Sequence, residues 1–203
     1  MRTHLLSAGL AFVLLAVPAF AQAPQGTPTR VRGTVEKLDG MTLTVKSRDG
    51  TDVTVAMTEK TGVRTLVNKS LSDIKQGDYV ASTGRPGPDG KLHAVEVRIF
   101  PEALRGVGEG QTPWDLTPDS MMTNATVSGV TTMASGETLK VSYKGKESEY
   151  VVDPTTPVQA FAPGDTSLLK PGVYVVVLAQ KQADGKIVAG NIVAEANGIK
   201  PSM

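Results

Sequence analysis

An internal repeat is the feature that most constrains the fold of this chain of 203 residues. Four short segments recur in the same order, the first two at a spacing of 96 residues and the last two at a spacing of 95. They are 31–33 and 127–129 (VRG, VSG), 40–45 and 136–141 (GMTLTV, GETLKV), 74–80 and 169–175 (IKQGDYV, LKPGVYV), and 89–94 and 184–189 (DGKLHA, DGKIVA). Such recurrence indicates a tandem duplication of one structural unit, here about 70 residues long.

Each unit has the pattern of strands rather than helices. Between residues 41 and 46, apolar side chains alternate with threonine and lysine, and a similar alternation runs from 53 to 57. Asp39-Gly40 and Asp49-Gly50 are hairpin signals between these runs. We expect strands at 31–38, 41–46, 53–57, 79–83 and 92–100, with a less regular stretch after the third strand that could end in a short helix or turn at 70–74.

The order of three strands, an insert and two strands is typical of the five-stranded OB-type barrel, which closes a small sheet on itself. A five-stranded sandwich is the alternative. The predicted fold class is all-β: two OB-like barrels at residues 30–100 and 124–196, joined by a Gly/Pro-rich connector at 101–123. Residues 22–29 and 197–203 are rich in Pro, Gly and polar residues and are expected to be flexible ends.

The first 21 residues have the three parts of a secretory signal peptide. Arg2 precedes an apolar run at 5–17, and Ala19-Phe20-Ala21 predicts cleavage before Gln22. The alternative, a membrane anchor, needs more length, because 13 helical residues reach only about 20 Å of a hydrocarbon core of roughly 30 Å. We therefore expect a periplasmic or secreted protein with no membrane span in the mature chain.

Composition narrows the chemistry of the mature chain. Without Arg2 and His4 it has 20 basic and 20 acidic residues, a single histidine, His93, and no cysteine. Disulfides and thiolate metal sites are therefore excluded. The neutral balance and few aromatic residues make nucleic acid an unexpected partner, because single-strand binders combine basic grooves with aromatic platforms.

Two patterns that could carry catalysis are better explained structurally. Gly106-x-Gly108-x-Gly110 differs from a dinucleotide fingerprint in its third spacing and is not followed by a helix pattern, which favours a linker. His93 shares an expected strand face with Val97, and its repeat partner is Val188, so we interpret it as a packed strand residue. We expect neither an enzyme nor a cofactor.

A metal-handling accessory role in the cell envelope is the alternative function. Met121, Met122 and Met133 are thioether candidates for Cu(I), and Glu109, Asp115 and Asp119 could gather around Ca²⁺. Adjacent strand residues point to opposite faces, and the carboxylate spacing matches no Ca²⁺ loop. Core packing and loop solvation are therefore the preferred interpretations, and no metal site is predicted.

Trp114, the single tryptophan, is the main candidate binding residue. It lies in the connector with Arg105, Glu109 and Asp115, where it would either fix the junction of the two barrels or anchor a ligand or partner there. We expect a non-enzymatic binding or scaffold module, whose partner is an envelope protein or a small ligand.

The unit V-x-G-x6-G-x-T-L-x-V, followed by K-x-G-x-Y-V and D-G-K, resembles a bacterial secreted small-barrel family of unknown function. The connector P-E-A-L-R-G-x-G-E-G-x-x-P-W-D-L is similar to that of proteobacterial two-barrel members. The resemblance implies a fold and secretion, but it supplies no catalytic residues.

Overall fold

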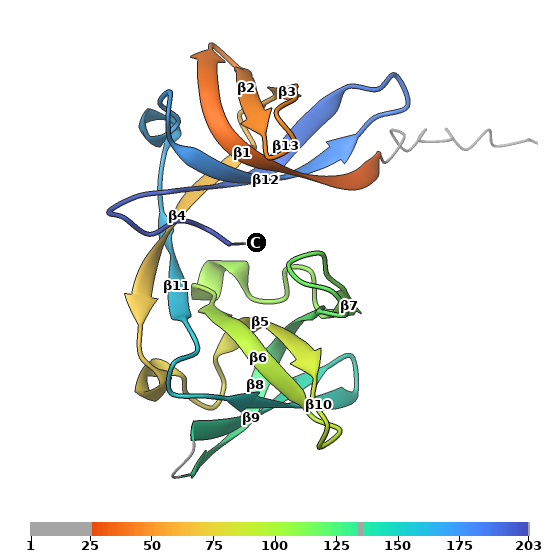
Figure 1. Ribbon diagram of the computed structural model, residues 1–203, viewed down its shortest axis with the longest axis vertical. Helices are drawn as coiled ribbons and strands as arrows, with labels where there is room; N and C mark the ends of the chain where they lie inside the picture. The colour runs from red at the N-terminus through yellow and green to blue at the C-terminus, as the bar shows by residue number, and fades with distance from the viewer. Residues whose placement is uncertain (1–25, 134–135, 203) are drawn as a thin grey trace, which may run out of the picture.

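The computed structural model describes residues 26–133 and 136–202, which form an all-β protein (Figure 1). The strands are β1 (Thr27–Asp39), β2 (Thr42–Ser47), β3 (Asp52–Ala56), β4 (Gly62–Lys69), β5 (Tyr79–Pro86), β6 (Leu92–Ile99), β7 (Gly110–Pro113), β8 (Met121–Met133), β9 (Gly136–Tyr143), β10 (Lys146–Val152), β11 (Val158–Pro163), β12 (Tyr174–Lys181) and β13 (Ile187–Ala194). Short 3-10 helices are η1 (Leu71–Asp73), η2 (Glu102–Leu104) and η3 (Thr166–Leu168). The expected signal peptide, residues 1–21, lies outside the described residues.

The alternating sequence pattern places the apolar side chains of β2 on one face of the strand. In β2, Leu43 and Val45 are fully buried, whereas Thr44 between them is partly exposed. The two expected hairpins are confirmed, since β2 pairs antiparallel with β1 and with β3. Gly40 closes the first of them with a φ of 56°, in the left-handed region that favours glycine.

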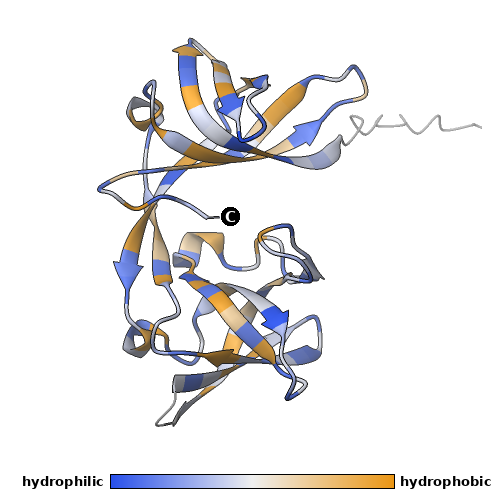
Figure 2. Ribbon diagram, in the orientation of Figure 1, coloured by the Kyte–Doolittle hydropathy of each residue, from blue (hydrophilic) through white to orange (hydrophobic). Residues whose placement is uncertain are grey.

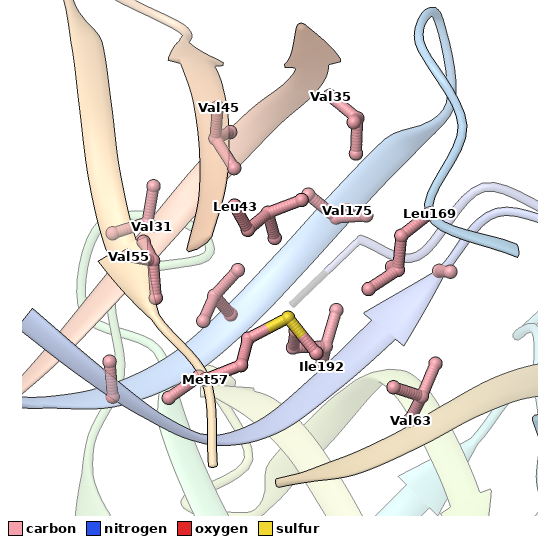
Figure 3. Close-up of a cluster of buried hydrophobic side chains, with 14 residues drawn as sticks. Val31, Val35, Leu43, Val45, Val55, Met57, Val63, Leu169, Val175 and Ile192 are labelled. Carbon is pink, nitrogen blue, oxygen red and sulfur yellow. The ribbon is translucent and has the colours of Figure 1, made fainter. Parts of the chain in front are cut away.

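The first three strands and the last two strands of the chain form one closed ring, which we call the terminal unit. β1 pairs with β2, β2 with β3, and β3 runs parallel to β13. β12 then pairs with both β13 and β1, which completes the ring. Its core contains 14 buried residues, all from 31–63 and 169–194 (Figure 3).

The middle of the chain forms a second ring, the central unit. Its order is β8, β9, β10, β6 and β5, with β10 parallel to β6 and β5 paired again with β8. The buried core of this unit comes entirely from residues 74–158 and includes Val80, Val97 and Tyr150. Each unit therefore has a core of its own, and the central unit is inserted between the two parts of the terminal unit.

These units differ from the expected barrels at 30–100 and 124–196, because each takes three strands from one sequence repeat and two from the other. The repeats place equivalent apolar residues inward: Val80 matches Val175, and Val97 matches Ile192. Strands from either repeat can therefore complete either ring with the same inward pattern.

The exchange takes place at β4 and β11, in stretches that the sequence pattern had left without strands. Residues 62–64 of β4 run parallel to β13, and β4 then pairs antiparallel with β11 through Lys69. β11 in turn runs parallel to β6 of the central unit. The two strands lie side by side and carry the chain between the units (Figure 1). Because β4 leads the chain from the terminal unit to the central unit, β5 and β6 complete the ring of the central unit and not the ring that contains β1–β3.

Both ends of the described chain are held by the fold rather than being free. Thr27 already pairs with Lys181, so β1 begins inside the segment expected to be flexible. At the other end, Pro201 is buried and Ser202 hydrogen-bonds to the central unit. The last described residues lie between the two units (Figure 1).

Candidate functional site

The outward face of the terminal unit is apolar where it faces the central unit. On β12, Val175 and Val177 point into the ring core, whereas Val176 and Leu178 belong to a separate cluster outside it. Figure 2 shows the hydrophobic character of this strand. The cluster also includes Trp114 of the connector, together with Leu66, Phe161, Tyr174, Val193 and Ile199. A strand that is apolar on both faces must be shielded from water on both, and here the connector shields the outer face of β12.

A cavity of about 500 Å³ lies between this face, the connector and the central unit. Trp114, Phe100, Phe161 and Leu178 form much of its apolar wall, and Met122 of β8 belongs to the opposite side. Within the described residues its lining includes two arginines, Arg30 and Arg64, and no acidic side chain. Size and lining are those of a small-molecule site, for which roughly 300–1,000 Å³ and a few polar groups are typical.

Trp114 is held in the cavity wall by a compact turn. Its backbone N–H donates to the Ser120 carbonyl (2.8 Å), and the Ser120 hydroxyl donates to the Trp114 carbonyl (2.9 Å). Ser120 is itself buried. The Trp114 indole N–H is buried and has no hydrogen-bond partner among the described residues. The tryptophan is therefore fixed in place, with its indole N–H buried in the wall and not open to the cavity.

Asp115 joins the connector to β1. Arg32 donates to its two carboxylate oxygens at 2.8 and 2.7 Å, and an Arg30 nitrogen lies 3.6 Å from Asp115 Oδ1. The hydrogen bonds from Arg32 hold the pKa of Asp115 below its usual value. The Arg30 guanidinium also stacks on Trp114, with its carbon 3.7 Å from the ring centroid. The Asp115 carboxylate therefore balances part of the positive charge of Arg30 and Arg32 at this edge of the cavity.

Arg105 and Glu109, the other two predicted site residues, lie apart from this arrangement. Arg105 forms two 2.6 Å hydrogen bonds with Glu102 and donates to the Gly77 carbonyl (3.0 Å). Glu109 accepts a hydrogen bond from the backbone N–H of Lys144 (2.9 Å). The structure therefore brings Trp114 and Asp115 together, and uses Arg105 and Glu109 to fasten the connector to the central unit.

Arg64 is a site residue that the sequence reasoning missed. It lies on β4, opposite Val193, and its guanidinium donates to Asn191 Oδ1. Burial lowers the pKa of Arg64, and no carboxylate among the described residues pairs with it. The signal that could have located this face is the apolar run at 173–179, because a strand without alternation is buried on both sides.

A fully buried arginine, Arg98, lies on the facing side of the central unit. Arg98, 1% exposed, donates to Glu96 and to Ser202, both at 2.8 Å. Ser202 and Thr83 also donate to the Glu96 carboxylate. Arg98 Nε and Nη1 lack partners among the described residues. The ion pair and the hydroxyl of Ser202 thus fasten the end of the described chain to the central unit.

The methionines and carboxylates considered for metal binding lie on β8 and in the connector. Met122 is buried in the cavity wall and accepts a contact from the Thr83 hydroxyl, whereas its neighbour Met121 is only partly buried. In the part of the chain that the structure describes, no three His, Cys, Asp or Glu side chains gather at one point. Nor does this part contain a helix with the length and apolarity required to cross a membrane.

His93 differs from its expected placement. The β5–β6 pairing shifts register at Thr83 and Gly84, and a bulge of this kind changes the face on which later residues lie. Ala94 packs toward the central core, and His93 is partly exposed, with its Nε2 3.1 Å from Asp89 Oδ1. The single imidazole of the described chain therefore lies on the surface, away from the cavity.

Comparison with protein families reveals two copies of one domain. DUF5666, a domain of unknown function, matches residues 32–98 and again residues 125–193. No curated protein and no solved structure matches the chain. The two family matches confirm the internal repeat and span more than half of the chain. This chain therefore belongs to the DUF5666 family and carries its domain twice.

Proposed function

We propose that this protein is an exported, non-enzymatic binding module that holds a small ligand between two OB-like barrels. The observation that carries the proposal is the cavity of about 500 Å³ with Trp114 in its wall. Its apolar lining, with Arg30, Arg64 and Asn124 among the lining residues, provides the combination of hydrophobic contact and a few polar groups that ligand sites use. The enclosing connector favours a small molecule over a flat protein surface.

The pairing order supports the OB-like part of the proposal. Each repeat contributes five ring strands, which can be numbered 1 to 5 in chain order: β1, β2, β3, β5 and β6 in the first repeat, and β8, β9, β10, β12 and β13 in the second. With this numbering, each ring runs 1-2-3-5-4 and back to 1. Strands 3 and 5 are parallel in both rings. A five-stranded closed order with this crossing is what an OB-like barrel requires, although strands 4 and 5 come from the other repeat.

Export and the absence of catalysis rest on the sequence. The charged start, the apolar run at 5–17 and the Ala19-Phe20-Ala21 segment support a secretory signal. A mature chain without cysteine and with one exposed histidine offers little for nucleophilic or general base catalysis. Nothing in the described part of the chain favours metal handling.

Binding to the cavity can be tested with a neutral apolar dye, N-phenylnaphthylamine, whose emission rises in an apolar site. We expect saturable binding to the wild type and at least about tenfold weaker binding to Trp114→Ala, because the anchor of the cavity wall is lost. Met41→Ala is the matched control, since Met41 is an exposed apolar residue outside the cavity. Equal dye binding by wild type and Trp114→Ala, or none by the wild type, would contradict the proposal.

A further inference from the structure

We propose that the ligand is an amphipathic anion, with an apolar body inside the cavity and a carboxylate held by Arg64. This inference rests on the proposed function and adds the chemical class of the ligand. It starts from the charge of the lining: two arginines and no acidic side chain among the described residues, in a chain whose charges are almost balanced overall.

The duplication provides an internal comparison for Arg64. At the offset of 95 residues, Arg98 and Glu96 of the central unit correspond to Val193 and Asn191 of the terminal unit. In the central unit, β11 pairs with β6 and places Gln159 beside Arg98. In the terminal unit, β4 pairs with β13 and places Arg64 beside Val193. Both units therefore have an arginine at this pair of strands, contributed by β6 in the central unit and by β4 in the terminal unit.

The two arginines differ in what balances their charge. Arg98 has the Glu96 carboxylate at 2.8 Å, whereas Arg64 has the Asn191 amide at the position equivalent to Glu96. An amide oxygen accepts a hydrogen bond from the guanidinium but leaves its positive charge uncompensated. Arg64 is half-buried, and a partly desolvated cation without a counter-ion favours an anion at its free N–H groups.

The backbone beside Arg64 leaves room for this arrangement. Gly62 lies directly opposite Asn191, and a Cβ added at Gly62 would stand 2.8 Å from Asn191 Oδ1 and 2.9 Å from Arg64 Nη1. Any side chain there would displace the Arg64–Asn191 pair. The glycine thus allows the two polar side chains to approach one another at the edge of the cavity.

Arg30, the other arginine in the lining, is a weaker candidate for the anion contact. Its guanidinium already lies 3.6 Å from the Asp115 carboxylate and is stacked on Trp114. Its positive charge is therefore partly compensated within the protein. Arg64 is left to contact the carboxylate, while Trp114, Phe100 and Phe161 surround the apolar body.

Three probes with a ten-carbon chain test the charge requirement: decanoate, decanol and decyltrimethylammonium. The two ions are used below their critical micelle concentrations, and decanol below its solubility limit. Trp114 is the single tryptophan and lies in the cavity wall, so its fluorescence reports occupancy directly. Isothermal titration calorimetry measures the affinities. For the wild type we expect decanoate to bind about tenfold or more tightly than decanol, and decyltrimethylammonium to bind most weakly.

Two variants locate the anion contact. Arg64→Gln, which introduces the residue type of Gln159, should lower decanoate affinity about tenfold and leave decanol binding unchanged. Asn191→Asp, which restores a carboxylate as in Glu96, should have the same effect by pairing with Arg64. Arg85→Gln is the matched control, because Arg85 is exposed and outside the lining.

The possible results separate the two proposals. If decanol and decanoate bind with equal affinity, or if neither variant changes decanoate binding, the anion assignment is overturned and the binding function stands. If none of the three probes changes Trp114 fluorescence or gives heat, the anion assignment fails, and the binding function is decided separately by the experiment with N-phenylnaphthylamine. Loss of decanol binding in Arg64→Gln would assign Arg64 a structural role and would also overturn the anion contact.

Discussion

The guanidinium carbon of Arg30 lies 3.7 Å from the ring centroid of Trp114. Arg30 belongs to β1 of the terminal unit, and Trp114 to the connector that packs on the central unit. This stacked pair, with Asp115 beside it, therefore joins the two units at one edge of the cavity. Stacking of arginine on tryptophan is favourable by about 0.5–2 kcal/mol, depending on its exposure to water.

Replacing Trp114 with alanine should destabilise the protein without unfolding it. The ring cores do not contain Trp114, which packs only on the cluster between the units. We expect a loss of about 2 kcal/mol in the free energy of unfolding, below the 3–5 kcal/mol of a fully buried tryptophan. Urea denaturation followed by far-UV circular dichroism measures it, with Trp114→Phe as the control that keeps an aromatic ring. A loss of ordered structure in Trp114→Ala without denaturant would contradict this expectation.

A fragment spanning residues 70–158 should fold alone, whereas a fragment spanning the first repeat, residues 30–100, should not. The first contains all five strands of the central ring and its complete core. The second contains β1–β3 without β12 and β13, and β5 and β6 without β8–β10. Its own strands do not complete a ring, because the extended β4 carries β5 and β6 away from β1–β3. Dispersed amide signals in a proton–nitrogen NMR spectrum identify the folded fragment. A folded monomer of residues 30–100 would show that strand exchange is not required.

The contribution of Asp115 to stability should depend on pH. Its folded-state pKa is lowered by hydrogen bonds from Arg32. A lowered carboxyl pKa stabilises the fold above the unfolded pKa of about 3.9, and this contribution is lost as the pH falls through the folded value. Because Asp115 is half-exposed, solvent screening limits the effect to on the order of 1 kcal/mol. Asp115→Asn should therefore lower Tm at pH 7 and have little effect near pH 2. A Tm difference of the same size at both pH values would exclude the ion pair as its cause.

Replacing either Glu96 or Arg98 alone should destabilise the protein more than replacing both together. Glu96→Asn leaves a buried guanidinium uncompensated, and Arg98→Val leaves a buried carboxylate, so each should cost about 3 kcal/mol. The double variant reproduces the pair Asn191 and Val193 of the other unit and should lose less than either single variant. A double-mutant cycle from urea denaturation measures the coupling. Additive losses would show that the two side chains do not stabilise one another.

Strands β1–β3 follow from local signals in the sequence, whereas β4 and β11 do not. The alternation around Leu43 and Val45 and the turn at Gly40 require only near neighbours, and β1–β3 form as those signals predict. Trp114 stands out because an aromatic residue in a Gly-rich connector needs an apolar surface to cover it. Arg64 gives no such signal, because its role depends on Asn191, 127 residues away.

The sequence by itself determined that the chain contains two similar all-β repeats and that Leu43 and Val45 of β2 point inward. Only the tertiary structure decided which strands share a ring. The inward residues of the two repeats are nearly interchangeable, as Val80 and Val175 show, so local patterns favour exchanged and unexchanged pairing equally. The choice is made by β4 and β11, whose mutual pairing carries the chain from one unit to the other. The same crossing places Arg64 beside Asn191, and so it created the candidate site as well.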